Sequence, residues 1–222
     1  MRLRQGWGTR ICFPVSSTVL SPLVVSPCCG WVGVLVAVLV IAGSGRGAGK
    51  TAVGCALIAA MPELRWVAVK VTPHAHDLAD GLLEETDRNS EKDSARYLAA
   101  GAGHAFLIVR EMDGGLLEWI RQARKQEPAG GAMLVESNAV APWEVALSGE
   151  PAISLVVLAG PKAEWKPSVW NRIASAEALV LTGGLSLESL QPEFADRLCF
   201  ELPDGSWLTP ELCEFVRGEL LD

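Results

Sequence analysis

Short apolar runs alternate with polar, helix-like segments along most of the 222-residue chain. The apolar runs are rich in β-branched residues and predict buried strands at 38–42, 65–71, 105–109, 132–138, 153–158, 178–182 and 198–202. Helical spacing and capping signals predict helices at 50–61, 93–102, 116–126, 165–175 and 210–221. The acidic segment 78–92 predicts an exposed loop. This alternation predicts an α/β fold with a doubly wound, mostly parallel sheet between two helical layers.

A glycine-rich turn joins the first predicted strand to the first predicted helix. Such a strand–loop–helix context is typical of a phosphate-binding P-loop, and it predicts a three-layer αβα fold of P-loop NTPase type. Lys50 would reach the β- and γ-phosphates, and the Thr51 hydroxyl would bind Mg²⁺. Ser44 stands where the motif has its first glycine, between Gly43 and Gly45. The predicted nucleotide-binding residues are Ser44, Gly45, Arg46, Gly47, Ala48, Gly49, Lys50 and Thr51.

Acidic residues supply candidate partners for the metal. Glu136 ends an apolar run, where P-loop enzymes place a carboxylate that holds or orders the Mg²⁺ shell. We therefore expect Lys50 and Glu136 to be catalytic, with Glu136 binding the metal directly or through water. Asp93 begins a predicted helix, and it is either a helix cap or an outer-sphere Mg²⁺ partner.

Two histidines follow the second predicted strand. His74 and His76, with Asp77, could bind a metal or a second, anionic ligand. The alternative is a pair of exposed loop histidines, and the sequence leaves both interpretations open.

The N-terminal segment differs from the rest of the chain because residues 11–45 carry no charged side chain. Three prolines interrupt this segment, and its end feeds the P-loop strand, so a membrane-spanning helix is disfavoured. We expect a nucleotide-binding domain over 35–222, preceded by an extension at 1–34 that is disordered or comes from a mis-called start. A membrane anchor is the alternative.

The net charge bears on which partners are expected, and the cysteines bear on the expected redox environment. A net charge of −7 gives no electrostatic reason to expect nucleic-acid binding. The six cysteines form no C-x-x-C pair and suggest no disulfide framework, so a reducing, cytoplasmic location is expected.

The order of several motifs resembles the molybdopterin-guanine dinucleotide biosynthesis adaptor family. After the P-loop come Lys70 with the two histidines, the segment KDSARYLAAGA at 92–102 and the strand end MLVES at 133–137. The resemblance covers about residues 36–140. Ser137 and Asn138 replace the Gly-Phe pair that follows the glutamate in that family.

The resemblance implies a function as well as a fold. It implies GTP binding with Mg²⁺, slow hydrolysis, a homodimer and a helper role for a molybdenum-cofactor nucleotidyltransferase. It makes residues 45–51 the phosphate loop, Glu136 the acidic strand-end residue, and His74, His76 and Asp93 residues of the crevice. The sequence has no Asn-Lys-x-Asp motif, so GTP rather than ATP rests on the resemblance alone.

The sequence is compatible with three functions. The first is a nucleotide-binding accessory factor with weak NTPase activity. The second is an ATP-dependent ligase or kinase resembling dethiobiotin synthetase, which needs a second-substrate pocket near His74, His76 and Asp93. The third is a non-catalytic switch module in which nucleotide binding controls partner docking.

Overall fold

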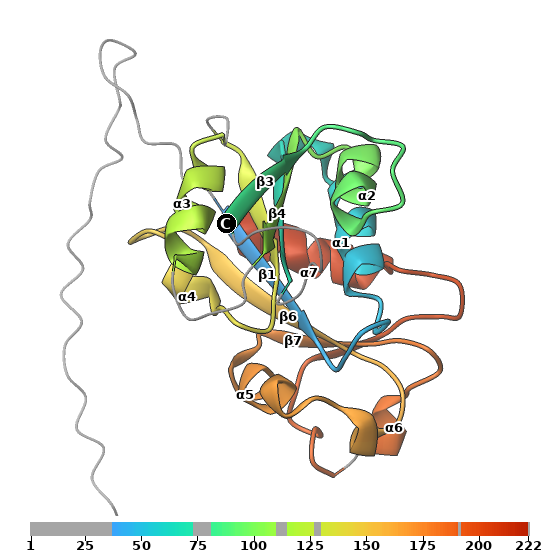
Figure 1. Ribbon diagram of the computed structural model, residues 1–222. Helices are drawn as coiled ribbons and strands as arrows, with labels where there is room; N and C mark the ends of the chain where they lie inside the picture. The colour runs from blue at the N-terminus through green and yellow to red at the C-terminus, as the bar shows by residue number, and fades with distance from the viewer. Residues whose placement is uncertain (1–36, 73–80, 110–114, 127–129, 191, 222) are drawn as a thin grey trace, which may run out of the picture. The chain divides into compact units, whose positions relative to one another are not determined.

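A computed structural model describes residues 37–72, 81–109, 115–126, 130–190 and 192–221 (Figure 1). The predictions for the extension at 1–34, and those for His74 and His76, fall outside these ranges. Among the described residues, no helix is both long enough and apolar enough to cross a membrane.

The described residues form one sheet of eight strands in the order β3-β4-β2-β5-β1-β6-β7-β8. Every neighbouring pair is parallel except β3 and β4, so the predicted mostly parallel, doubly wound sheet is confirmed. The strands are β1 (Ala37–Gly43), β2 (Val67–Thr72), β3 (Gly81–Glu85), β4 (His104–Val109), β5 (Ala132–Glu136), β6 (Ala152–Leu158), β7 (Ala178–Leu181) and β8 (Cys199–Glu201).

Helices cover both faces of this sheet (Figure 1). One face packs against α1 (Lys50–Ala60), α2 (Asp93–Ala100) and α7 (Pro210–Leu221). The other face packs against α3 (Leu116–Arg124), α4 (Pro142–Val145), α5 (Pro167–Ser175) and α6 (Leu187–Leu190). Short 3₁₀ turns lie at Pro62–Leu64 and Lys162–Glu164. The three-layer αβα arrangement is therefore confirmed.

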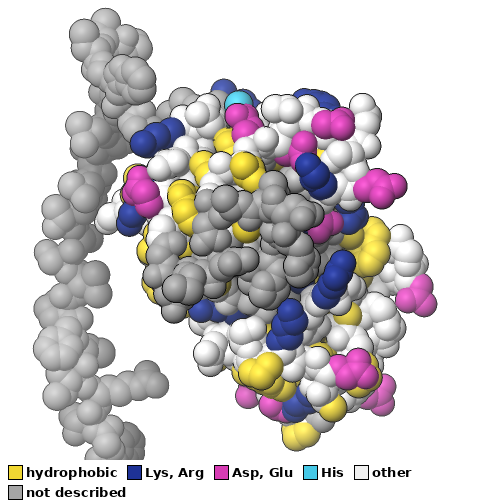
Figure 2. Space-filling model, in the orientation of Figure 1, with side chains coloured by type: hydrophobic (Ala, Val, Ile, Leu, Met, Phe, Trp, Pro, Cys, Tyr) yellow, Lys and Arg dark blue, Asp and Glu magenta, His cyan; other side chains and the backbone are white. Residues whose placement is uncertain are grey.

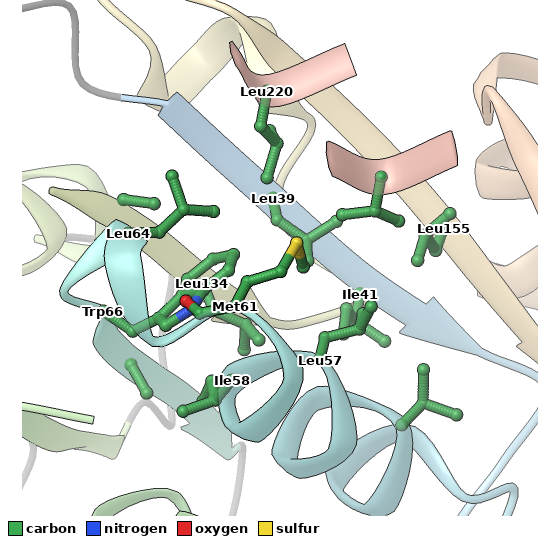
Figure 3. Close-up of a cluster of buried hydrophobic side chains, with 14 of the residues drawn as sticks. Leu39, Ile41, Leu57, Ile58, Met61, Leu64, Trp66, Leu134, Leu155 and Leu220 are labelled. Carbon is green, nitrogen blue, oxygen red and sulfur yellow. The ribbon is translucent and has the colours of Figure 1, made fainter. Parts of the chain in front are cut away.

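The central strand β1 is buried on both faces, as its uninterrupted apolar sequence predicts. Leu39 and Ile41 point into the core beneath α1, where Leu57 and Met61 meet them (Figure 3). Val38 and Val40, which alternate with them along the strand, belong to the core on the opposite face. This two-residue alternation is that of a strand between two helical layers. Packing on both faces holds β1 in place, and β1 leads directly into the P-loop.

The main difference from the predicted elements lies in the acidic segment before α2. The pattern predicts an exposed loop, but residues 81–85 form β3, antiparallel to β4 at the sheet edge. Leu82 packs against the core, whereas Leu83 is 39% exposed and Glu84 is exposed. Edge strands tolerate charged side chains, so their sequences look much like those of loops. The four-residue helices α4 and α6 were also not predicted, because they are too short to show a period.

The surface carries charges of both signs. On the face shown in Figure 2, the basic and acidic side chains are interspersed between apolar and polar atoms. The absence of a nucleic-acid partner remains a prediction from the net charge.

Candidate nucleotide-binding site

The P-loop connects β1 to α1 at the carboxyl end of the parallel strands (Figure 1). Gly49 is the N-cap of α1 and has a φ of 95°, and Gly47 has a φ of 79°. Backbone in this left-handed region favours glycine. The first N–H groups of α1 have no acceptor within the helix, so they can serve as donors to an anion. The loop thus has the backbone shape that a phosphate cradle requires.

Two glycines are also required for space. A Cβ on Gly43 would lie 2.8 Å from Cγ of Lys50 and 2.8 Å from the backbone oxygen of Val157. A Cβ on Gly49 would lie 2.6 Å from Cζ3 of Trp207. The loop is therefore packed closely between the start of α1, the end of β6 and the segment after β8.

Ser44, which replaces the first glycine of the motif, has a structural role of its own. Its buried hydroxyl accepts a hydrogen bond from Ala159 N at 3.0 Å and donates to Ala159 O at 3.2 Å. Its backbone N–H donates to Val157 O at 2.9 Å. Ser44 therefore fastens the P-loop to the end of β6, and its side chain points to that strand end.

Asn138 fastens the same loop from the other side. Its Oδ1 accepts from Gly43 N at 2.9 Å, and its Nδ2 donates to Gly43 O at 2.8 Å. One side-chain amide thus satisfies both backbone groups of the residue that ends β1. The two residues that depart most clearly from the expected motifs, Ser44 and Asn138, both stabilise the loop.

Lys50 lies across the P-loop. Its Nζ donates to Gly45 O at 2.7 Å. Burial lowers the pKa of Lys50, and the charges of Lys70 and Lys166 add to this effect, whereas Glu136 and Asp93 oppose it. Several lysines and two carboxylates therefore lie close enough to interact at this end of the sheet.

Glu136 receives two hydroxyl hydrogen bonds on one oxygen. Thr51 Oγ1 donates to its Oε2 at 2.7 Å, and the hydroxyl of Tyr97 donates to the same atom at 2.6 Å. Only 4% of Glu136 is exposed, and Tyr97 is fully buried. Burial raises the pKa of Tyr97 well above its usual value, and the nearby Glu136 raises it further. Tyr97 is therefore a hydrogen-bond donor that orients the carboxylate.

Lys70 brings a positive charge to the same cluster. Its Nζ lies 2.9 Å from Oε1 of Glu136, 2.5 Å from Oδ2 of Asp93 and 3.4 Å from Oγ1 of Thr51. The ammonium therefore bridges the strand-end glutamate and the first residue of α2. Asp93 makes no helix-cap hydrogen bond, because Lys92 is the N-cap of α2.

Each group in this ion pair stabilises the charged form of its partner. Burial disfavours the ammonium of Lys70, but the neighbouring Glu136 and Asp93 outweigh burial and raise its pKa. Burial likewise disfavours the Asp93 carboxylate, but the hydrogen bond and charge of Lys70 outweigh it and lower the pKa of Asp93. Arg96, which lies 3.3 Å from Asp93, acts in the same direction.

The oxygen atoms around Lys70 have the chemistry that Mg²⁺ prefers, namely one hydroxyl and two carboxylates. Within the described ranges no group of three or more His, Cys, Asp and Glu residues could hold a metal by itself. Mg²⁺ is usually held by one or two carboxylates together with phosphate oxygens and water. The residues present therefore fit a magnesium ion that arrives with a phosphate ligand.

Most of the residues predicted from the sequence meet at this site. The P-loop from Ser44 to Thr51 lies beside Glu136 and Asp93. Arg46 is exposed at the loop tip. The sequence did not assign Tyr97, Asn138 or Trp207 to the site, and it gave Lys70 only as part of a strand and of the motif order that carries the resemblance. A further signal was that Lys70 is the charged residue of a mostly apolar strand.

Comparisons with known proteins show what this fold is. No protein-family model matches the sequence, and no curated protein matches it significantly. Among solved structures, HypB from Helicobacter pylori, determined in complex with nickel, aligns with a TM-score of 0.51 and 15% identity. That alignment covers 84% of this chain and 86% of HypB.

Two further structures are less similar. LpxK from Aquifex aeolicus, in complex with ATP, aligns with a TM-score of 0.45 and 17% identity over 75% of this chain and 53% of LpxK. The MinC:MinD cell division complex from Aquifex aeolicus aligns with a TM-score of 0.42 and 13% identity, over 83% of this chain and 86% of that chain. At these identities the likeness concerns the fold alone. The chain has a three-layer αβα fold of the P-loop NTPase type, and the likeness to HypB concerns this fold only.

Proposed function

We propose that this protein binds a nucleoside triphosphate together with Mg²⁺ and hydrolyses it slowly. The contact that carries the proposal is the 2.7 Å hydrogen bond between Thr51 and Glu136, which lie 85 residues apart in the sequence. A hydroxyl at the start of the P-loop helix and a buried strand-end carboxylate are the pair that a magnesium-bound phosphate requires. The fold alone would not demand this contact.

Each residue of the site has a distinct part in this proposal. The loop N–H groups and Lys50 neutralise the phosphate oxygens. Thr51, Glu136 and, more remotely, Asp93 would hold Mg²⁺, which supplies charge neutralisation at the β- and γ-phosphates. Glu136 would also position the attacking water. Tyr97 fixes the glutamate for this task through its 2.6 Å hydrogen bond.

The same contacts support a slow reaction. Both oxygens of Glu136 already accept hydrogen bonds, Oε1 from Lys70 and Oε2 from Thr51 and Tyr97. Neither oxygen of Glu136 is therefore free of protein contacts to receive an attacking water. Hydrolysis through Glu136 should therefore be weak unless a partner rearranges these contacts.

The physiological role proposed from the resemblance is that of an accessory factor in molybdenum-cofactor guanine dinucleotide biosynthesis. It would bind GTP, form a homodimer and assist a nucleotidyltransferase. The geometry supports this role in one respect. Lys70, Asp93 and Glu136 come from the three segments that carry the resemblance, and they join in a single ion-pair cluster.

A second candidate is a ligase or kinase that transfers the phosphoryl group to an anionic substrate. Lys166 favours it, because this exposed residue is the N-cap of α5 and its backbone N–H donates to Ser44 O at 2.9 Å. The positive charge of Lys166 also helps to lower the pKa of Lys50. A cation in this position could hold a second anionic group next to the phosphates. A third candidate, the nucleotide-gated switch, would need the same site without turnover.

A calorimetric titration of the full chain tests the main proposal. Non-hydrolysable GTP and ATP analogues are titrated with and without Mg²⁺ into the wild type, Lys50→Ala and the control Lys125→Ala, which alters an exposed residue after α3. We expect magnesium-dependent binding that is lost only in Lys50→Ala. Equal affinity in all three proteins would exclude the P-loop as the binding site. Preference for guanine supports the accessory role, and preference for adenine supports the ligase or kinase.

A further inference from the structure

One aromatic side chain lies directly against the P-loop and plays no part in the site described so far. Trp207 contacts Gly49 through the six-membered ring of its indole, because a Cβ on Gly49 would lie 2.6 Å from Cζ3 and 3.3 Å from Cε3. Yet 43% of Trp207 remains exposed. An indole that rests on a phosphate-binding loop while it presents part of its ring to solvent is suited to contact a ligand.

The segment that carries Trp207 is well fixed. It follows β8 and begins with the buried Leu202. The neighbouring Ser206 donates from its backbone to Pro203 O at 2.9 Å and from its hydroxyl to Leu208 O at 2.8 Å. Leu208 packs against the core beneath α1. The indole is therefore held by a short turn anchored on both sides, and little ordering is needed when a ligand binds.

The order of the strands places Trp207 at the end of the site away from the metal ligands. Glu136 ends β5, on one side of β1, and Lys70 lies on β2 beyond it. Trp207 follows β8, on the other side of β1. A triphosphate whose γ-phosphate points toward Glu136 must therefore direct its nucleoside toward the β6–β8 side of the P-loop.

The end of β7 also reaches the loop on this side. The buried Thr182 donates from Oγ1 to Ala48 O at 3.0 Å, and Gly183 and Gly184 follow it with open space where side chains would stand. On this side of the P-loop, the partly exposed indole of Trp207 offers an aromatic face on which a flat base could stack.

We propose that Trp207 is the platform on which the nucleobase of the bound nucleotide stacks. This inference rests on the proposed nucleotide-binding function and adds the part of the site that holds the base. Stacking tolerates any base because every base has a π-face, and the purines offer the larger face, so we expect purine nucleotides to gain most from it. Since adenine and guanine both offer a full π-face, the contribution of Trp207 should be similar for ATP and GTP.

The test compares nucleotides with inorganic tripolyphosphate, which has the phosphates but no base. Each is titrated with Mg²⁺ into the full-length wild type, Trp207→Ala, Trp207→Phe and Trp143→Ala. Trp143 is a matched control, because it is a 64% exposed indole on α4 at the opposite face of the sheet. We expect Trp207→Ala to weaken ATP and GTP binding about tenfold to a hundredfold while tripolyphosphate binding stays unchanged. Trp207→Phe should retain most of the affinity, and Trp143→Ala all of it.

The other outcomes are separable. If Trp207→Ala weakens tripolyphosphate as much as the nucleotides, Trp207 only props Gly49 and the inference is wrong. If nucleotide affinity does not change, the base lies elsewhere and the inference is again wrong. If the wild type binds neither ligand, the proposed nucleotide-binding function itself fails. Nucleotide-induced quenching of tryptophan fluorescence that disappears in Trp207→Phe gives an independent positive reading.

Discussion

The ammonium of Lys70 lies 2.9 Å from Oε1 of Glu136, in the midst of the oxygen atoms that suit a magnesium ion. The protein's own cation thus compensates the two carboxylates beside the P-loop. A metal that binds through the same atoms must compete with this ammonium or displace it. Magnesium affinity should therefore depend on Lys70 as well as on the oxygen ligands.

The variant Lys70→Met tests this competition. It leaves Glu136 buried without its ion-pair partner, so we expect the free energy of unfolding to fall by about 1–3 kcal/mol. Mg²⁺ added together with a non-hydrolysable nucleotide should then raise the unfolding temperature of the variant more than that of the wild type. The control Lys92→Met removes an exposed lysine that lies 3.7 Å from Glu85. An equal response to Mg²⁺ in all three proteins would show that Lys70 does not occupy the metal position.

Replacing Glu136 by glutamine separates binding from turnover. The amide keeps an oxygen that can accept from Thr51 or Tyr97, so nucleotide affinity should stay within a few-fold of the wild type. Phosphate release in a single turnover should fall by at least about tenfold, because the amide cannot orient water as a carboxylate does. Glu118→Gln, on the exposed face of α3, is the control. Unchanged turnover in the Glu136 variant would remove this residue from the mechanism.

Asn138→Ala tests the fastening of the loop. The substitution leaves the N–H and C=O of Gly43 without their side-chain partners, at a cost of about 1–3 kcal/mol in the free energy of unfolding. Phosphate binding should weaken in parallel, because Gly43 leads into the cradle. Denaturant unfolding and tripolyphosphate titration measure the two effects. Asn171→Ala, at an exposed position, serves as the control. An Asn138→Ala variant that is as stable as this control would contradict the prediction.

The stability of the Lys70–Asp93 pair should depend on pH in a defined direction. Lys70 lowers the pKa of Asp93 in the folded protein, so this stabilisation is present above the unfolded value of about 3.9 and is lost as the pH falls through the folded value. Urea unfolding between pH 3 and 7 should therefore show a shallower acid limb for Asp93→Asn than for the wild type. Asp196→Asn, at an exposed position, should retain the wild-type slope. Parallel curves for all three proteins would mean that the ion pair contributes nothing.

Local patterns were sufficient to predict the P-loop. The run before Gly43, the glycines and the following Lys50 and Thr51 form one continuous stretch, so strand, turn and helix can be inferred together. Glu136 could be predicted for the same reason, because it directly ends an apolar run. Both are features of short segments whose structure depends mainly on neighbouring residues.

The remaining contacts depend on the packing of distant segments. Tyr97 reaches Glu136 across 39 residues, and Asn138 reaches Gly43 across 95. No local pattern indicates such pairs, because they exist only after the strands have taken their order in the sheet. The edge strand β3 was missed for a different reason, since its acidic side chains on an exposed edge have the composition of a loop.

Ser44 and Asn138 hold the beginning of the P-loop from the strands on its two sides. The conformational entropy of this backbone is consequently lost when the domain folds and not when a ligand arrives. A phosphate group bound as proposed would meet donors that already point in one direction, so little of its binding enthalpy would be offset by ordering of the protein. The loop is held at its entrance from β1 by the contacts of Ser44 and Asn138, so the fold would set any affinity for anions in advance.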